Sequence, residues 1–513
     1  MDPPRIEWRR VSREPDEAPH LRRTLGLLDV ALMIVAGLVS LNTMAPLVQN
    51  GPIVLWLWPL AIIFFFIPQA ITVLELSRHY PGEGAVYVWP GRLLGEMHGF
   101  LSGWCYWMAN IVYVPTLVVS SVGLAAYMFG ASGAALADSG LAIEIGSFGL
   151  LSILIWLNIR GLAAEKLLVN VAALGTFTVG IILIGLTAWL ATHPGVSVAR
   201  LVWRPSGFDW HLISVFSLLC FSLLGLEIAS NVGDEIHDAR RTLPRALLIG
   251  AVLVGVLDVL LTVSMLLAAP PEGVNAVQGV LEAINGVAQR AGMGSLAPAI
   301  AGLLALSIAG TASAWLAAPA RIPYVAALEG HLPRAFARLH PRYASPHVAL
   351  LVCGALCAGA LYLSFAGAGL NEAFLTILDL SVILSLLQYV YMYSSLLALV
   401  FRRRDLEFHF SRITLAMAGI TGIGVTLLAT VCAFVPTRQV EHLGLFEGKL
   451  FGFCAIVLGT GLVCFRLNFR SAQPSGTDGL LSGAEHRTGA GLLQERDDPQ
   501  ASAVETGGKR KRE

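Results

Sequence analysis

The sequence predicts an all-α integral membrane protein with twelve transmembrane helices. Of its 513 residues, 56% are hydrophobic and only 13% are charged, too little polar side chain to cover a soluble globule. The mean hydropathy is +0.70, and apolar stretches of about twenty residues, the length that crosses a bilayer, recur along the chain. The formal net charge is zero, so nothing favours nucleic acid as a partner, and the lipid bilayer is the expected environment.

Twelve apolar stretches are candidates for the membrane spans, and each is read from a window of about twenty residues. These stretches cover residues 27–49, 54–78, 97–129, 146–160, 167–191, 211–232, 246–269, 297–320, 347–366, 372–401, 412–435 and 450–468. The fourth of them, 146–160, is the shortest.

The distribution of basic residues predicts the orientation of these spans. The N-terminal arm (residues 1–24), every second loop and the C-terminal tail together carry 29 of the 34 Lys and Arg residues. Arg321 is one of the cations assigned to these loops. Because basic segments stay in the cytoplasm, we expect both termini there and a multi-pass protein of the cell membrane, plasma or inner.

Two segments outside the spans have their own patterns. Val277, Val280, Leu281, Ile284 and Val287 recur at helical spacing, which predicts an amphipathic helix on the outer face. Residues 470–513 lack the apolar side chains needed to order a chain, so a disordered cytoplasmic tail is expected. Its basic end, residues 509–512, either contacts anionic lipid or stays in solvent.

The first and sixth spans each contain a weak point for a helix near mid-depth. In the first span Gly37 precedes Ser40, Leu41 and Asn42; in the sixth span Phe221 and Ser222 precede Gly225. These are corresponding places if the first ten spans form two five-helix repeats of opposite orientation. Interrupted helices present free N–H groups to an anion and free C=O groups to a cation, which suits a zwitterion. Close helix packing is the alternative use of such glycines.

An acid follows the second weak point. Glu227 lies two residues beyond Gly225, and an acid at membrane depth must be paired, protonated or solvated. We therefore expect Glu227 to act in gating or proton coupling.

Three stretches resemble the amino acid-polyamine-organocation transporter superfamily. They are FSLLGLEIASNVGDEIHDARRTLPRA at 221–246, VLELSRHYPGEGAVYVWPGRLLGEMHGFLSGWCYW at 73–107, and SAWLAAPARIPYVAALEGHLPRAFARLHPRYASP at 313–346. The resemblance implies two inverted repeats, residues 25–192 and 193–403, with discontinuous first and sixth helices, and accessory helices in 404–469. It implies alternating-access transport of amino acids, related amines or polyamines, without a cofactor.

The resemblance also assigns roles to single residues. Phe221 matches the aromatic residue that closes over substrate, Trp315 an aromatic gate, and Asn110 a polar position that faces substrate. Core packing for Phe221 and Trp315, and an interhelical hydrogen bond for Asn110, are the alternatives. The first span departs from the family, because Ser40-Leu41-Asn42 replaces the usual Gly-Ser-Gly-like turn.

The coupling ion, H⁺ or Na⁺, is left open by the residues. Asp258 and Asp379 lie in the seventh and tenth spans. Each is a proton relay, a partner for a cationic substrate, or an acid bonded to Ser or Thr hydroxyls. Thr311 and Ser313 are possible Na⁺ ligands, and no other metal site is predicted. Some relatives carry a lysine within the fifth span, but Lys166 lies at its cytoplasmic start.

Two other classes of protein are alternatives to a transporter. A membrane sensor would keep the binding fold without moving the solute. A membrane enzyme is not expected, because no His-Glu-x-x-His or Gly-x-Ser-x-Gly motif occurs. No Lys or Arg lies in the middle of a predicted span, which favours neutral or cationic solutes over dianions.

Overall fold

The computed structural model describes residues 23–472, except 40, 130, 138, 193–210, 269–273, 275–278, 366–369, 404–405 and 436–442. The described residues form helices and no β-strand, which confirms the all-α prediction. Two isolated bridges join Leu25 to Ile236 and Glu83 to Val232. The predictions for residues 1–22 and for the chain beyond Ala472 lie outside the described residues.

Nine helical stretches within the described ranges are long and apolar enough to cross a membrane. They cover Gly51–His79, Glu96–Phe129, Gly140–Ile159, Glu165–Thr192, Ala239–Ala268, Gly294–Leu328, Leu378–Arg402, Arg412–Cys432 and Leu450–Leu467. Shorter apolar helices, Leu27–Leu38, Val215–Ile228 and His347–Leu363, occupy the places of the predicted first, sixth and ninth spans. The chain is therefore a multi-pass membrane protein, and the count of twelve spans stays a prediction.

The first part of the chain contains one interrupted span followed by longer helices. Pro46 lies inside the short second helix, where it cannot donate a backbone hydrogen bond. The helices are α1 (Leu27–Leu38), α2 (Leu41–Val48), α3 (Val54–Ala61), π-helical η2 (Ile62–Phe66), α4 (Ile67–His79), α5 (Ala85–Leu94), α6 (Glu96–Ala126), α7 (Ala131–Ala137), α8 (Gly140–Ile159) and α9 (Leu162–Thr192).

The second part of the chain repeats this pattern of a short helix followed by long ones. Its elements are α10 (His211–Ser222), the short 3-10 helices η4 (Leu226–Ile228) and η5 (Gly233–Glu235), α11 (Ala239–Ala268), α12 (Gly279–Arg290), α13 (Ala297–Ala317), α14 (Arg321–Leu328), α15 (His347–Phe365), α16 (Leu370–Arg402), α17 (Arg412–Cys432) and α18 (Leu443–Ala472).

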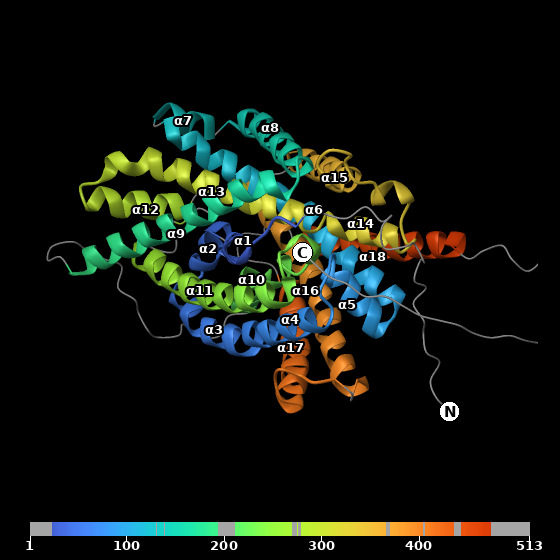
Figure 1. Ribbon diagram of the computed structural model, residues 1–513. Helices are drawn as coiled ribbons and strands as arrows, with labels where there is room; N and C mark the ends of the chain where they lie inside the picture. The colour runs from blue at the N-terminus through green and yellow to red at the C-terminus, as the bar shows by residue number, and fades with distance from the viewer. Residues whose placement is uncertain are drawn as a thin grey trace, which may run out of the picture. The chain divides into compact units, whose positions relative to one another are not determined.

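The core of the bundle is formed by α6, α13 and α16. Helix α6 packs against both α13 and α16, α13 packs against α9, and α1 packs against α9, α11 and α13. Figure 1 shows α1, α10, α13 and α16 close together in the middle of the bundle. This arrangement brings the two short helices, α1 and α10, to the centre.

Helix α12 matches the predicted amphipathic helix. Val280, Leu281, Ile284 and Val287 are buried, and α12 packs against α2, α9, α11 and α13. Its apolar face is thus covered by protein. Val277 lies outside the described residues.

Candidate functional site

The sixth span is interrupted directly after α10. The N–H groups of Leu223 and Leu224 bond to carbonyls three residues back, at 3.2 and 3.0 Å, which tightens the last turn. Gly225 then has φ +125°, a conformation that residues with a side chain rarely adopt. A Cβ at Gly225 would lie 2.9 Å from side-chain atoms of Leu38 and Trp315. The sequence therefore ends the helix here, and the turn can be built only with glycine.

The first span is interrupted beside this turn. Helix α1 ends at Leu38, Val39 is not helical, and α2 begins at Leu41. Two carbonyls at the end of α1 accept hydrogen bonds from α13: Ala36 O from Thr311 Oγ1 at 2.7 Å, and Gly37 O from Trp315 Nε1 at 3.0 Å. Helix α13 thus satisfies carbonyl groups that the break leaves without a helical partner.

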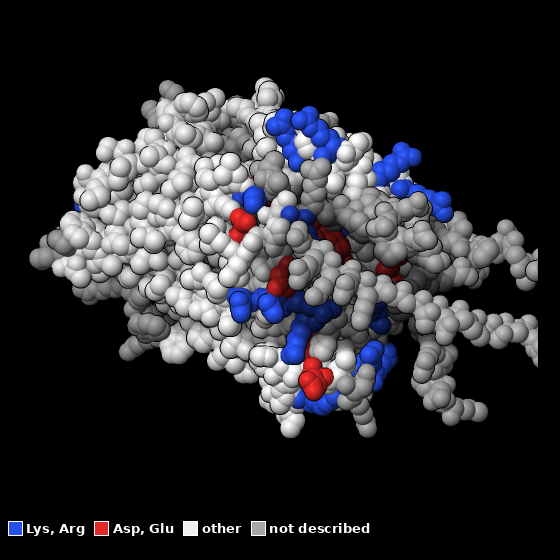
Figure 2. Space-filling view, viewed as in Figure 1, with Lys and Arg blue, Asp and Glu red and all other residues white. Residues whose placement is uncertain are grey.

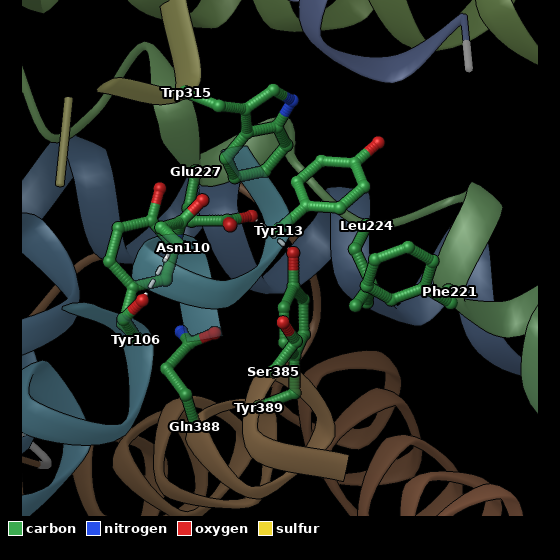
Figure 3. A pocket seen from close by; sticks show the side chains of 10 residues that line it. All are labelled: Tyr106, Asn110, Tyr113, Phe221, Leu224, Glu227, Trp315, Ser385, Gln388 and Tyr389. Carbon is green, nitrogen blue, oxygen red and sulfur yellow. Dashed lines mark hydrogen bonds between the residues drawn. The ribbon is translucent and has the colours of Figure 1, made fainter. Parts of the chain in front are cut away.

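A small cavity lies beside the interruption of the sixth span, and Trp315 connects it to the end of α1 (Figure 3). Its volume is about 20 Å³, roughly the space of one water molecule. None of the described residues that line it is Lys or Arg. They are Tyr106, Asn110 and Tyr113 on α6, Phe221 at the end of α10, Leu224 and Glu227 beyond it, Trp315 on α13, and Ser385, Gln388 and Tyr389 on α16.

Aromatic rings surround one part of this cavity. Tyr113 is edge-on to Phe221 and to Trp315, with ring centroids 5.3 and 5.9 Å apart, and Tyr106 lies 6.3 Å from Trp315. Rings in such an arrangement stabilise one another and also present faces that attract cations.

The Tyr389 hydroxyl connects the second interruption to the acid. It accepts hydrogen bonds from the Gly225 N–H at 3.0 Å and from Gln69 Nε2 at 2.7 Å, and it donates to Glu227 Oε2. All three hydrogen-bonding positions of the hydroxyl are therefore used. The Glu227 side chain is buried, yet its partner is a neutral group.

The structure brings some of the predicted site residues together. Asn110, Phe221, Glu227 and Trp315 line the cavity, while the Gly37 carbonyl and the Gly225 N–H hold Trp315 and Tyr389 beside it. The Asn110 amide also donates to Tyr106 O at 2.7 Å, as in the alternative considered for it.

The remaining predicted residues lie elsewhere. The Ser222 hydroxyl donates to Leu219 O at 2.8 Å and does not line the cavity, and Leu41 is buried in the core. Ser40 and the side chain of Asn42 lie outside the described residues. Asp258 is completely buried on α11, away from the cavity, and its carboxylate oxygens accept no hydrogen bond from any described residue.

Most of the residues predicted as candidates for ion coupling form hydrogen bonds with other groups of the protein. The Thr311 hydroxyl bonds Ala36 O, and Ser313 Oγ accepts a hydrogen bond from Asn158 Nδ2 at 3.0 Å. Lys166 Nζ donates to Thr24 O at 3.0 Å and lies 3.5 Å from Asp29 Oδ2. Asp379 is partly buried on α16.

Sequence reasoning missed several of the lining residues. Ser385, Gln388 and Tyr389 lie three and four residues apart on α16, so they share one helix face, a pattern that the sequence does contain. Gln388 is fully buried, and neither its amide nitrogen nor its amide oxygen has a hydrogen-bond partner among the described residues. A buried amide in that state is available to a ligand.

A second group of buried charges includes Glu235, which lies eight residues after Glu227 in the chain. Arg321 Nη2 and Nε donate to Glu235 Oε1 at 2.8 and 3.1 Å, and Nη1 donates to Ala317 O at 2.5 Å. Arg321 was predicted to lie in a loop, but its side chain is fully buried, because Glu235 and the Ala317 carbonyl replace water around the guanidinium. Glu83 and Glu165 also lie within electrostatic reach of Arg321.

Burial has the largest effect on the pKa values of Glu83 and Glu235, the two acids of this group that lie outside the long helices. Burial raises the pKa of the Glu83 carboxyl well above its ordinary value, the charge of Glu235 raises it further, and Arg321 acts in the opposite direction. Burial also raises the pKa of Glu235, while Arg321 lowers it. We call Glu83, Glu165, Glu235 and Arg321 the Arg321 cluster.

Long apolar helices around a buried and partly polar cavity are features of a membrane protein with a solute pathway. The chain belongs to the amino acid permease family, whose model matches residues 25–459. The family is one of transporters, so the prediction that the protein is not an enzyme is confirmed.

Related proteins are transporters as well. An uncharacterized transporter of Legionella pneumophila is 26% identical over 442 residues, 84% of this chain and 94% of the relative. A glutamate/gamma-aminobutyrate antiporter of Lactococcus lactis is 24% identical over 74% of this chain and 77% of the relative. A probable agmatine/putrescine antiporter from the same species is 22% identical over 62% of this chain and 67% of the relative.

Proposed function

We propose that this protein is a secondary active transporter, a permease or an antiporter, that moves amino acids or related amines and polyamines by alternating access. The observation that carries the proposal is that two interrupted spans meet beside one cavity, which is lined by a buried acid and aromatic rings. Interrupted helices at membrane depth are tolerated where they line a pathway, and transporters use them to bind solutes near the midplane.

The chemistry of the cavity favours a ligand with an ammonium group. Glu227 supplies the single acidic side chain of the lining residues, and Tyr113, Phe221 and Trp315 supply ring faces for a cation. The unpartnered Gln388 amide offers both a donor and an acceptor to the rest of the ligand. Relatives named for agmatine/putrescine and for glutamate/gamma-aminobutyrate exchange agree with an amine-bearing substrate.

The small size of the cavity supports a mechanism in which the protein changes conformation to admit the substrate. A space of about 20 Å³ holds a water molecule and no amino acid. Substrate entry therefore requires the rings of Phe221 and Tyr113 to separate, and the two interruptions provide hinges for that movement. In this proposal the twelve spans form two inverted five-helix repeats, residues 25–192 and 193–403, with two accessory helices and both termini in the cytoplasm.

We propose H⁺ as the coupling ion. The hydroxyls of Thr311 and Ser313 already bond protein groups, which leaves them poor candidates as Na⁺ ligands. Glu227, in contact with the cavity, is the acid that would exchange a proton with solvent or substrate, and Asp258 is a second buried acid on α11.

The experiment is solute counterflow with purified protein in proteoliposomes. A thermal-shift screen against amino acids and polyamines first identifies a ligand, because a ligand of the folded form raises apparent stability. Vesicles loaded with that ligand are then diluted into the radiolabelled ligand. We expect transient accumulation above equilibrium. Binding without accumulation would instead identify a membrane sensor and would overturn the transport proposal.

A further inference from the structure

An apolar groove lies on the lipid-facing side of α4 and α11, apart from the substrate cavity. Its volume is about 650 Å³, within the roughly 300–1,000 Å³ typical of ligand pockets. Gly255 faces Phe66 across it without a side chain, and a Cβ at Gly255 would lie 3.7 Å from the Phe66 ring. The other lining residues are Ile62, Ile67, Ala70, Ile71, Leu74, Leu248, Ala251, Val252, Val256, Val259, Leu260 and Phe410.

Each wall of the groove is a helical stripe that ends in an arginine. On α4 the stripe of Ile67, Ile71 and Leu74 continues one turn later to Arg78. On α11 the stripe of Val256, Val252 and Leu248 continues, toward the helix start, to Arg245. Spacings of three, four and seven residues keep side chains on one helix face. The two arginines therefore lie at the same end of the groove, because α4 ends there and α11 begins there.

These two arginines are available to a ligand. Both are exposed, and neither has a hydrogen bond or an ion pair to any residue in the described part of the chain. Nearby charges are already balanced or point to water: Arg241 pairs with Asp238 at 3.7 Å, and Glu407 is exposed on the loop before Phe410. Figure 2 shows Lys and Arg side chains where α4 ends and α11 begins, and in further groups on the same half of the visible face, whereas the opposite end is almost free of them.

We propose that the groove binds an anionic phospholipid of the leaflet on the arginine side. One acyl chain lies along the apolar stripes, and the headgroup phosphate lies between Arg78 and Arg245. An apolar slot closed at one end by two unpartnered cations matches a molecule with a long apolar chain and one anionic end. A transmembrane helix of another protein, about 10 Å across, would match the apolar wall but would leave both cations unpaired. The lipid would join α4 of the first part of the chain to α11, which also packs against α1.

The test is native mass spectrometry of the purified full-length protein with phosphatidylglycerol and phosphatidylcholine. We expect phosphatidylglycerol to bind more tightly than phosphatidylcholine. Arg78→Ala and Arg245→Ala should each weaken phosphatidylglycerol binding about fivefold. Arg334→Ala with Arg338→Ala, two exposed arginines on η8 (Arg334–Ala337) and just after it, is the matched control and should change nothing.

A second variant tests the apolar part of the site with both arginines in place. Val252 is 59% exposed, so Val252→Trp is tolerated by the fold and fills the groove. It should reduce phosphatidylglycerol binding at least as much as the loss of one arginine. Equal binding of phosphatidylglycerol by wild type, Arg78→Ala, Arg245→Ala and Val252→Trp would overturn the proposal. A dimer that dissociates only in Val252→Trp would also overturn it, since a second copy would then occupy the groove.

Discussion

Glu227 and Glu235 are two buried acids only eight residues apart, yet their surroundings differ. Glu235 lies 2.8 Å from the guanidinium of Arg321, so its charge is balanced within the protein. Glu227 receives a hydrogen bond from the neutral Tyr389 hydroxyl, and the described residues that line its cavity include no Lys or Arg. The two acids therefore have different roles. Glu235 fixes the chain beyond the sixth span, whereas Glu227 has a charge that a substrate or a proton must balance.

The largest effect should follow from removing Arg321. Arg321→Met leaves Glu235 buried without its cation, which typically costs about 3–5 kcal/mol. We expect a large fall in thermal stability, measured by fluorescence-detected size exclusion after heating. The double variant Arg321→Met, Glu235→Gln should recover part of the loss. If Arg321→Met were as stable as wild type, the balanced-charge description of Glu235 would be wrong.

Removing the partner of Glu227 should cost less, because that partner is neutral. Tyr389→Phe keeps the ring but leaves the Gly225 N–H, Gln69 and Glu227 without the hydroxyl, for a loss of about 1–3 kcal/mol in the free energy of unfolding. The same heating assay measures it. Tyr391→Phe, two residues further along α16 and not in the cavity, is the matched control. A loss for Tyr389→Phe larger than that for Arg321→Met would reverse the comparison.

Substitution of Gln388 should raise the stability of the protein rather than lower it. Its buried amide has no partner in the described structure, so Gln388→Leu, of similar size, should raise stability by about 1 kcal/mol. The same change should weaken substrate binding about tenfold if the amide contacts the substrate. Thermal unfolding and a binding titration measure the two effects on one sample. A variant that lost stability and kept its affinity would show that Gln388 is a packing residue.

The smallest effect should be the pH dependence contributed by Glu83. Because burial raises its pKa above the unfolded value near 4.5, the folded state holds this proton more tightly than the unfolded state. Glu83 therefore costs no stability below that value, and stability falls as the pH rises toward the higher folded pKa. Glu83→Gln removes this cost, so its melting temperature should match wild type near pH 4 and exceed it at pH 8. A constant difference across that range would contradict this assignment.

The sequence predicted the two interruptions and Glu227 because their signals are local. A glycine, a neighbouring acid and the position of Phe221 can be read from one short stretch, and the structure places Phe221 and Glu227 in one cavity. Long-range pairs are not visible in this way. Tyr389 meets Gly225 across 164 residues of chain, and Gln388 on the same α16 face becomes informative only when the facing helices are known.

The prediction that Arg321 lies in a loop was wrong for a related reason. A basic residue at the end of an apolar stretch normally belongs to a loop, and only the fold brings Glu235, from another segment, to within 2.8 Å of it. Composition and hydropathy therefore predicted the class and the approximate helices, while the identity of buried ion pairs depended on tertiary contacts.

The rate of substrate counterflow in proteoliposomes from pH 5 to pH 8, compared between wild type and Glu227→Gln, tests the central claim most directly. Glu144→Gln, at an acid of α8 that lies outside the cavity, is the control. We predict that Glu227→Gln folds normally, transports at least about tenfold more slowly and loses its pH dependence, while Glu144→Gln behaves as wild type. An unchanged rate and pH profile in Glu227→Gln would contradict the role given to this acid.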